Sequence, residues 1–288
     1  MRPLQDTSDD FAEAVALLSE GFPGLASGFW PQALARLKHY GGNTQAGVPL
    51  GYFMLDKGRP VGVALTPASV RRRADGSTSR MVNISSWYVR RPYRWRAGFM
   101  LRGILAGEDA VYTDLTATPE LQSTLSVLGM QAVNRGIAVH PLPLLCLHPA
   151  RGGQLYGLTA SEPWPERGPP RAMVEAHREL GCMPLVLTHG GQQQLVICRR
   201  TTVRGLPAAQ LVYAESRSQL LRHIGVLARH LLSMGFAFFV RDTRQAVSTA
   251  TAIFRPREVW FARGDMFEDH TDIFASELCI IHLPALRS

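Results

Sequence analysis

The sequence predicts an α+β protein made of two similar domains, and three observations support this fold class. The chain has 288 residues, which is the length of one large domain or two ordinary ones. Apolar residues make up 46% of it, enough to form a buried core. The order helix, hairpin, long strand, helix and apolar strand occurs once in each half, so two copies of one domain are the simplest explanation.

In the first half, capping residues and apolar periodicity place the helices, and β-forming residues place the strands. A helix is expected over 8–20 because Thr7 or Ser8 can cap it and two aspartates follow at its positive end. The other elements expected here are a helix over about 30–39, a hairpin of strands 51–55 and 60–67, a strand over 81–89, a helix over 99–105, a strand over 110–115 and a helix from Thr118 to 128.

Residues 141–170 contain seven of the 19 prolines and four glycines, which makes them the best candidate for a linker or crossover. We therefore expect an N-terminal domain over 1–140 and a C-terminal domain over 171–288. The elements expected in the second domain are a helix over 174–180, a hairpin of strands 185–188 and 194–200, a strand over 208–213, a helix over 218–233 and strands over 236–240, 258–262 and 278–283.

The excess positive charge lies in one short part of the chain. The net charge is +8, from 31 basic and 23 acidic residues. Residues 71–102 hold nine of the arginines and one acid, Asp75, so the rest of the chain, with 22 of each sign, is neutral. A dense arginine cluster suits a compact anion such as a nucleotide or a pyrophosphate, because each planar guanidinium donates paired hydrogen bonds. For 71–73 a solvated turn is the simpler interpretation. The nine are Arg71, Arg72, Arg73, Arg80, Arg90, Arg91, Arg94, Arg96 and Arg102.

Composition and motifs exclude several classes of protein. The apolar stretches reach about ten residues, well short of the roughly 20 that cross a bilayer, and no secretory signal pattern is found. The cysteines have no metal-binding spacing, so free thiols in a reducing cytoplasm, without a bound metal, are expected. The four cysteines are Cys146, Cys182, Cys198 and Cys279.

Two segments resemble the GNAT acyltransferase superfamily. Residues 84–101, ISSWYVRRPYRWRAGFML, match the family's order of strand, turn, Arg-initiated loop and helix. Residues 113–130, TDLTATPELQSTLSVLGM, resemble the family's next strand and helix. The C-terminal half resembles a more diverged copy, so the chain is similar to tandem-GNAT proteins. This resemblance implies two GNAT-like domains, each a mixed, mostly antiparallel sheet flanked by helices.

The resemblance implies that the first segment binds coenzyme A as a co-substrate. A loop that opens a helix points unpaired N–H groups at one spot, where the helix dipole also favours a pyrophosphate. The backbone N–H of Val89 would donate to the thioester carbonyl. The implied cofactor-binding residues are Tyr88, Val89, Arg90, Arg91, Arg94, Trp95, Arg96, Ala97, Gly98 and Phe99.

The sequence departs from the family's pattern at several positions. Ala97 stands where the first glycine of the loop is usual, and Phe99 stands where a small residue is usual. Leu125 replaces the tyrosine that usually protonates the leaving thiolate, and serines occupy the region of the usual glutamate. The corresponding loop of the second copy, 215–218, has no glycine, so we expect that copy not to bind coenzyme A.

Two functions remain open at this point. The first is transfer of an acyl group, with acetyl expected, from acyl-CoA to an amine or hydroxyl of a small molecule or protein, with Ser86 and Tyr112 as candidates for proton transfer. The second is a non-catalytic protein on the same scaffold that docks an acidic partner, such as an acyl carrier protein, through the arginines of 71–102. A nucleic acid fits less well, because its binders usually spread their basic residues over a wider face. No membrane partner is expected.

Overall fold

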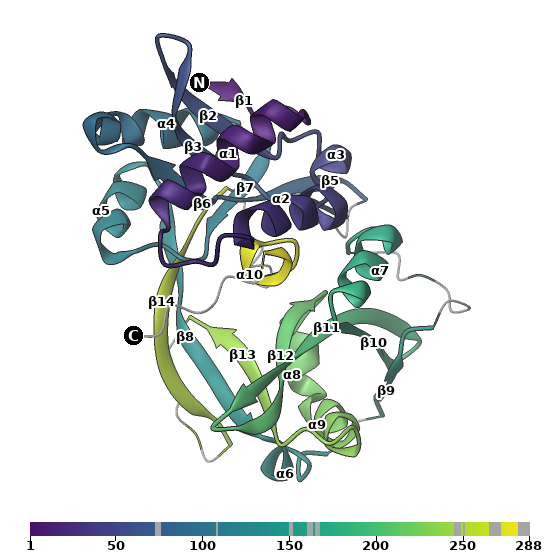
Figure 1. The fold of residues 1–288 in the computed structure, drawn as a ribbon. Helices are drawn as coiled ribbons and strands as arrows, with labels where there is room; N and C mark the ends of the chain where they lie inside the picture. Colours follow the sequence, from purple (N-terminus) through teal and green to yellow (C-terminus); the bar gives the residue numbers. More distant parts are fainter. Residues whose placement is uncertain are drawn as a thin grey trace.

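The computed structural model of the chain shows an α+β fold in which strands of both halves join one large sheet (Figure 1). This agrees with the predicted fold class. The structure describes residues 1–72, 76–107, 109–149, 152–159, 164, 168–244, 249, 251–264 and 272–281.

A four-stranded antiparallel sheet lies in the first half, with the order β1-β2-β3-β6. It contains the predicted hairpin, in which Phe53 pairs with Val63. Its strands are β1 (Arg2–Pro3), β2 (Gly51–Asp56), β3 (Arg59–Leu65) and β6 (Ser85–Val89).

A ten-stranded sheet runs through both halves, with the order β4-β5-β7-β14-β8-β13-β12-β11-β10-β9. Only two of its neighbouring pairs are parallel, β5 with β7 and β12 with β13. Its strands are β4 (Ala68–Arg72), β5 (Thr78–Asn83), β7 (Ala110–Asp114), β8 (Gln131–Pro141), β9 (Gln154–Gly157), β10 (Cys182–His189), β11 (Gln192–Val203), β12 (Leu206–Ala214), β13 (Phe238–Thr243) and β14 (Ile253–Arg263).

Helices cover the faces of these sheets (Figure 1). Thr7 caps the first one as predicted, because its hydroxyl accepts a hydrogen bond from the Asp10 N–H at 3.3 Å. The predicted helix over 218–233 is divided at His223 into α8 and α9. The helices are α1 (Ser8–Gly21), α2 (Phe29–Tyr40), α3 (Asn43–Ala46), the 3₁₀ helix η1 (Arg91–Arg96), α4 (Ala97–Ile104), α5 (Pro119–Val127), α6 (Leu142–Leu145), α7 (Arg171–Glu179), α8 (Arg217–Arg222), α9 (Ile224–Ser233) and α10 (Glu277–Ile280).

Two long strands join the halves. β8, which the sequence analysis did not predict, pairs with β13 of the second half and with β14. β14 comes from the second half but lies between β7 and β8 (Figure 1). Each predicted domain therefore takes part in the sheet of the other, and the boundaries at 140 and 171 stay predictions.

The strand predicted over 81–89 is in fact two strands that belong to different sheets. β5 runs parallel to β7, and the Ile84 N–H still donates to the Thr113 carbonyl at 2.7 Å. Beyond Ile84 the chain leaves β7, and β6 pairs with β3 instead. Ser86 has a φ of +45° at this point, a conformation that non-glycine residues rarely adopt. The two strands β6 and β7 thus diverge, and each is followed by a helix.

The strand predicted over 278–283 is wrong for the described residues, because Glu277–Ile280 form helix α10. A short apolar run does not distinguish a strand from a buried helical turn. Cys279, Ile280 and Ile281 are buried in the same core as Leu34 and Leu37 of α2. The C-terminal segment therefore completes the core of the first half, as the position of α10 beside α2 shows (Figure 1). Residues 282 and 283 lie outside the described part.

The four cysteines are free thiols, as predicted. Cys182, Cys198 and Cys279 are buried, and Cys146 is half-buried. The sulfur atoms of Cys182 and Cys279 lie 3.7 Å apart, so β10 and the C-terminal segment touch through these two side chains.

Removing the packing of the C-terminal segment is expected to destabilise the protein. Ile280 is fully buried, and Ile280→Ala leaves a cavity in the shared core, which should lower the free energy of unfolding by about 2–5 kcal/mol. Urea unfolding followed by circular dichroism measures this change. Ile253→Ala is the matched control, because Ile253 is 52% exposed and its truncation should change stability by less than about 0.5 kcal/mol. Equal effects of the two variants would contradict the structural role of α10.

Candidate functional site

The segment between β6 and α4 is helical rather than an open loop. The predicted loop over 94–99 begins inside η1 and ends inside α4. Within it the N–H of Tyr93 donates to the Arg90 carbonyl at 2.9 Å, and the N–H of Ala97 donates to the Arg94 carbonyl. Because a 3₁₀ helix bonds its amides to carbonyls three residues back, η1 uses N–H groups that a phosphate-binding loop would leave free.

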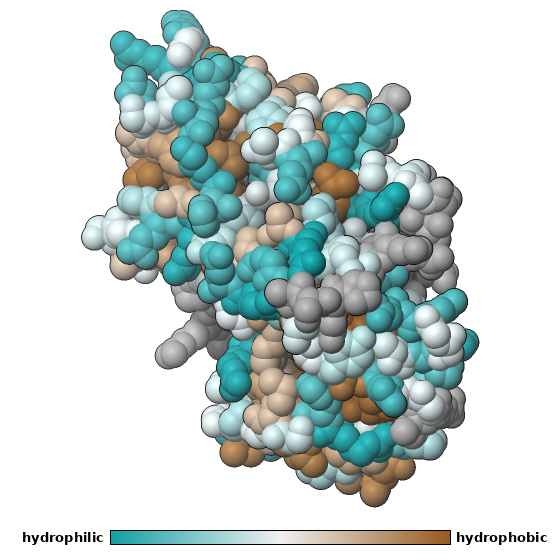
Figure 2. Space-filling model, turned by 90° about the vertical axis from the view of Figure 1, so that its right-hand side faces the viewer, coloured by the Kyte–Doolittle hydropathy of each residue, from teal (hydrophilic) through white to brown (hydrophobic). Residues whose placement is uncertain are grey.

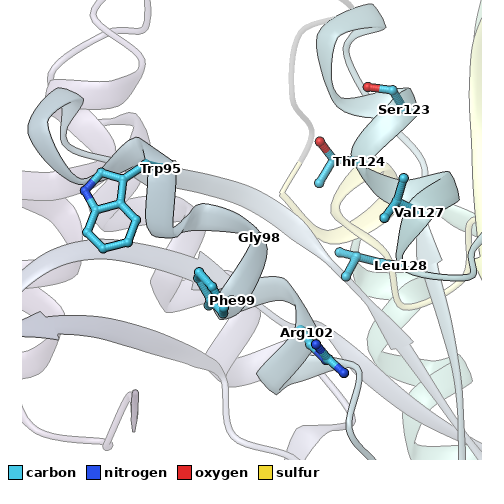
Figure 3. Close-up of a pocket in the computed structure, with 8 residues that line it drawn as sticks. All are labelled: Trp95, Gly98, Phe99, Arg102, Ser123, Thr124, Val127 and Leu128. Carbon is cyan, nitrogen blue, oxygen red and sulfur yellow. The ribbon is translucent and has the colours of Figure 1, made fainter.

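A cleft of about 350 Å³ lies between α4 and α5, the helices that follow the diverging strands (Figure 3). Its volume falls within the range of roughly 300–1,000 Å³ that is usual for small-molecule sites. Trp95 and Phe99 are 74% and 68% exposed, so neither ring has collapsed into the cleft. A Cβ added at Gly98 would meet no other atom within 4 Å. The lining residues are Trp95, Gly98, Phe99 and Arg102 on one side and Ser123, Thr124, Val127 and Leu128 on the other.

The arginines of 71–102 do not form one cluster in the structure. Arg71 is buried, and its guanidinium also lies 4.5 Å from the centre of the Phe274 ring. At least four of the nine are neutralised by acids that lie far away in the sequence, and Arg73 lies outside the described residues. The four ion pairs are Arg71 with Asp272 at 3.1 Å, Arg80 with Asp109 at 3.6 Å, Arg90 with Glu20 at 2.9 Å and Arg96 with Asp56 at 3.2 Å.

Three further arginines bear on the cleft. Arg102 lines it, and Arg91 and Arg94 are exposed on η1, the helix that also carries the lining residue Trp95. The Nε of Arg94 donates to the Val89 carbonyl at 3.4 Å. The sequence analysis counted Arg102 in the charged window but did not assign it to the cofactor site. The α5 residues of the cleft were missed as well, because only the fold brings α5 beside α4.

Tyr88 and Val89 belong to the wall formed by β6. The Tyr88 hydroxyl donates to the Glu20 carboxylate at 2.8 Å, which also binds Arg90. Burial, and then this contact, raise the pKa of Tyr88 above its ordinary value. Val89 is buried and pairs with Gly62 of β3. These residues hold β6 in place but do not line the cleft.

The side chain of Glu277 is buried between β6 and the end of β7, at the point where the two strands begin to separate. Glu277 of α10 accepts hydrogen bonds from the hydroxyls of Ser85 and Ser86 on β6 and of Thr116 beyond β7. The Ser86 contact measures 3.3 Å. The N–H of Glu277 donates to the side-chain oxygen of Asn83 at 3.0 Å. One carboxylate from the C-terminal segment therefore bridges both diverging strands, and no sequence signal pointed to it.

Two carboxyl groups of this region have raised pKa values. Burial is the main cause for Asp114, whose pKa rises to about 7, and the nearby Glu277 adds to the shift. The Thr116 N–H donates to Asp114 at 3.1 Å, which lowers the pKa in part. Burial also raises the pKa of Glu277, against the opposing effect of its hydroxyl donors. Among the described residues no arginine, lysine or histidine forms an ion pair with either acid.

The structure separates the two residues predicted for proton transfer. Ser86 belongs to the group around Glu277, whereas Tyr112 packs in the core cluster with Val82 and Leu101. The Tyr112 hydroxyl lies against Gly107, where a Cβ would come within 2.5 Å of it. Burial raises the pKa of Tyr112. The geometry thus favours Ser86 and gives Tyr112 a packing role.

The second half has a related arrangement of strands and a helix. β12 runs parallel to β13, as β5 runs parallel to β7, and α8 follows β12. The first residue of α8, Arg217, forms a two-pronged ion pair with Asp242 of β13. This internal pair occupies the guanidinium; that the second copy does not bind coenzyme A stays a prediction.

The described residues contain no group of three or more histidine, cysteine, aspartate or glutamate side chains placed to hold a metal ion. In the same part of the chain, no helix is both long and apolar enough to cross a membrane. The surface seen in Figure 2 carries small apolar areas among hydrophilic side chains.

The raised pKa of Asp114 predicts a specific dependence of stability on pH. The folded carboxyl keeps its proton up to about pH 7, whereas the unfolded one loses it near pH 4, so the folded state binds more protons in between. Stability contributed by this group is therefore lost as the pH rises from about 4 to about 7. Asp114→Asn removes the carboxyl that titrates. Calorimetry should therefore show that the Tm of this variant falls less than the Tm of the parent protein between about pH 4 and pH 7. Parallel Tm profiles for the two proteins would contradict the assignment.

No protein-family model matches the chain, and no curated protein matches it in sequence. Solved structures do share its fold. A GCN5-related N-acetyltransferase from Anabaena variabilis has a TM-score of 0.58 at 10% identity, over 89% of this chain and 71% of that one. One from Kribbella flavida has a TM-score of 0.55 at 12% identity, over 91% and 70%. Eis1 from Mycobacterium abscessus has a TM-score of 0.54 at 15% identity, over 91% and 72%.

These identities show similarity of fold, and the aligned regions include most of the chain. The chain has the fold of the GNAT acyltransferase superfamily.

Proposed function

We propose that the protein transfers an acyl group, with acetyl the expected one, from acyl-CoA to an amine or hydroxyl of an acceptor. The observation that carries this proposal is the cleft between α4 and α5, beside the divergence of β6 from β7. The structural neighbours named above that are described as N-acetyltransferases support the same class of reaction.

The residues of the cleft suit the chemistry of coenzyme A, which is both anionic and partly apolar. Arg102 in the cleft, with the exposed Arg91 and Arg94 beside it, would bind the phosphates. Trp95 and Phe99 offer exposed aromatic surface to the adenine and the pantetheine arm. Gly98 lines the cleft as well. The other predicted binding residues do not line it and would act by holding β6, η1 and α4 in place; these are Tyr88, Val89, Arg90, Arg96 and Ala97.

The reaction itself requires a modest contribution from the protein. The acceptor nitrogen or oxygen attacks the thioester carbonyl, and the thiolate of the coenzyme leaves. Holding the two reactants together can supply much of the rate enhancement. A group that accepts the acceptor's proton adds typically 10²–10⁴-fold. Ser86, at the point where the strands separate, is the proposed group nearest to this step.

A second candidate function rests on a different observation. η1 uses the amides that a pyrophosphate loop would present, and four of the nine arginines are already paired. A non-catalytic protein that docks an acidic partner, such as an acyl carrier protein, through Arg91, Arg94 and Arg102 would need no such amides. The two candidates differ in one respect: only the first requires free coenzyme A to bind in the cleft and acyl transfer to follow.

Coenzyme A and acetyl-CoA are expected to bind in the cleft, and titration calorimetry measures this directly. At 100 times its Kd the ligand should stabilise the fold by about 2.7 kcal/mol, which a thermal-shift assay detects. Arg102→Ala removes a charged donor and should weaken binding about tenfold or more. Trp95→Ala should weaken it as well.

The control for these variants is Arg80→Ala. Arg80 carries the same charge in the same charged window, but it pairs with Asp109 and does not line the cleft. Its affinity for coenzyme A should stay within about twofold of the parent protein. Absence of binding at millimolar coenzyme A would overturn the enzyme proposal, and salt-sensitive binding of an acyl carrier protein in its place would favour the second candidate.

A further inference from the structure

We propose that Ser86 and Glu277 form a proton relay: the Ser86 hydroxyl takes the proton of the attacking acceptor amine, while Glu277, supplied by the C-terminal segment, takes the proton of Ser86. This inference rests on the proposed acyl transfer and names its proton acceptor. Ser86 would be the catalytic residue, and Glu277 a positioning residue that acts through it.

The position of Ser86 is the first argument. Ile84 makes the last backbone contact with β7, and Ser86 lies two residues further on, where the strands have begun to separate. Its φ of +45° is a costly conformation for serine, which tertiary contacts must maintain. The contact of its hydroxyl with Glu277 at 3.3 Å is one of them.

The surroundings of Glu277 are the second argument. One oxygen of its carboxylate accepts from Ser85 and Ser86 on the side of β6, and the other accepts from Thr116 on the side of β7. Glu277 is completely buried, whereas Ser86 keeps 7% of its surface exposed and Thr116 is half-buried. A substrate would therefore exchange a proton with Glu277 through one of these hydroxyls, and the position of Ser86 where β6 leaves β7 favours that of Ser86.

Other charged and titratable groups near this segment do not replace Glu277 as the proton acceptor. Asp114 interacts with it electrostatically, and its own hydrogen-bond donor is the Thr116 N–H. His177 is held neutral by burial, which lowers its pKa to about 4, and it accepts from the Ala275 N–H. The remaining groups packed around residues 272–281 are Arg71 with Asp272, Cys182 with Cys279, and Arg199, which donates to the Leu278 carbonyl.

The step balances in protons and electron pairs. The neutral amine attacks the thioester carbon, the N–C bond forms, and the C–S bond breaks with its electron pair on sulfur. One N–H proton passes to the oxygen of Ser86 as the Ser86 proton passes to Glu277. The thiolate takes a proton from water, and Glu277 returns its proton to solvent through Ser86 before the next turnover.

The test compares variants that differ in a single group. Glu277→Gln keeps the size of the side chain and one accepting oxygen but cannot take the proton, so kcat should fall about 100-fold or more. The KM for acetyl-CoA should stay unchanged, and the rise of kcat/KM with pH that reports the proton acceptor should disappear. Ser86→Ala should have the same effects. Glu277→Asp should recover part of the activity.

Ser69→Ala is the matched control, because Ser69 is also a buried strand serine, on β4, but its hydroxyl forms no hydrogen bond with Ser86 or Glu277. Its kcat should stay within about threefold of the parent protein, with the pH profile retained. Tm and calorimetric coenzyme A binding verify that each variant is folded. If a variant does not fold, the relay is tested on the parent protein by measuring kcat in mixtures of H2O and D2O. Because the relay moves two protons in one step, kcat should then depend on the D2O fraction along a curve rather than a straight line.

The outcomes separate the relay from the function on which it rests. Full activity and an unchanged pH profile in Glu277→Gln would overturn the relay and leave the acyl transfer intact. An equal loss in Ser69→Ala and Ser86→Ala would overturn it too, because the loss would then follow from disturbing any buried strand serine. A parent protein that neither binds coenzyme A nor acylates any amine would overturn the proposed function and the relay together.

Discussion

The divergence of β6 from β7 after Ile84 is the constraint on which the candidate site depends. Up to that residue β5 is held to β7 by backbone hydrogen bonds, and beyond it β6 is held by β3. Because helices follow both strands, their separation places η1 and α4 on one side and α5 on the other. The cleft with Trp95, Phe99 and Arg102 is a direct consequence of this arrangement.

Contacts from the C-terminal segment hold β6 and β7 at the point where they begin to separate. Glu277 joins the hydroxyls of both sides, and the apolar residues that follow it complete a core shared with α2. The ion pair between Arg71 and Asp272 fixes the beginning of the same segment. The packing of the C-terminal segment and the position of Ser86 are thus coupled, since Glu277, more than 190 positions from Ser86 along the chain, takes part in both.

Local patterns were sufficient to predict much of the fold. The hairpin of β2 and β3 and the cap at Thr7 follow from neighbouring residues and were found. The long strand β8 was missed because a polar residue interrupts its apolar pattern. Asn134 is buried there, since its side-chain oxygen accepts from the N–H groups of Gly136 and Thr243.

The site was harder to predict, because its decisive contacts join distant parts of the chain. Nine arginines in one window suggested a single cationic patch, but acids from four other regions neutralise at least four of them. The exposed aromatics of η1 and α4, which were predicted to bind the cofactor, line the cleft, whereas its α5 wall was not predicted. Glu277 had no local signal, because only the folded chain brings it to Ser86.

Hydrogen–deuterium exchange with and without coenzyme A tests the central claim most directly, because it locates the ligand without relying on a variant or on turnover. If the ligand occupies the cleft, the amides of η1, α4 and α5 should exchange more slowly, and those around Arg217 should not change. Protection confined to the second half of the chain, or no protection anywhere at saturating coenzyme A, would contradict the account.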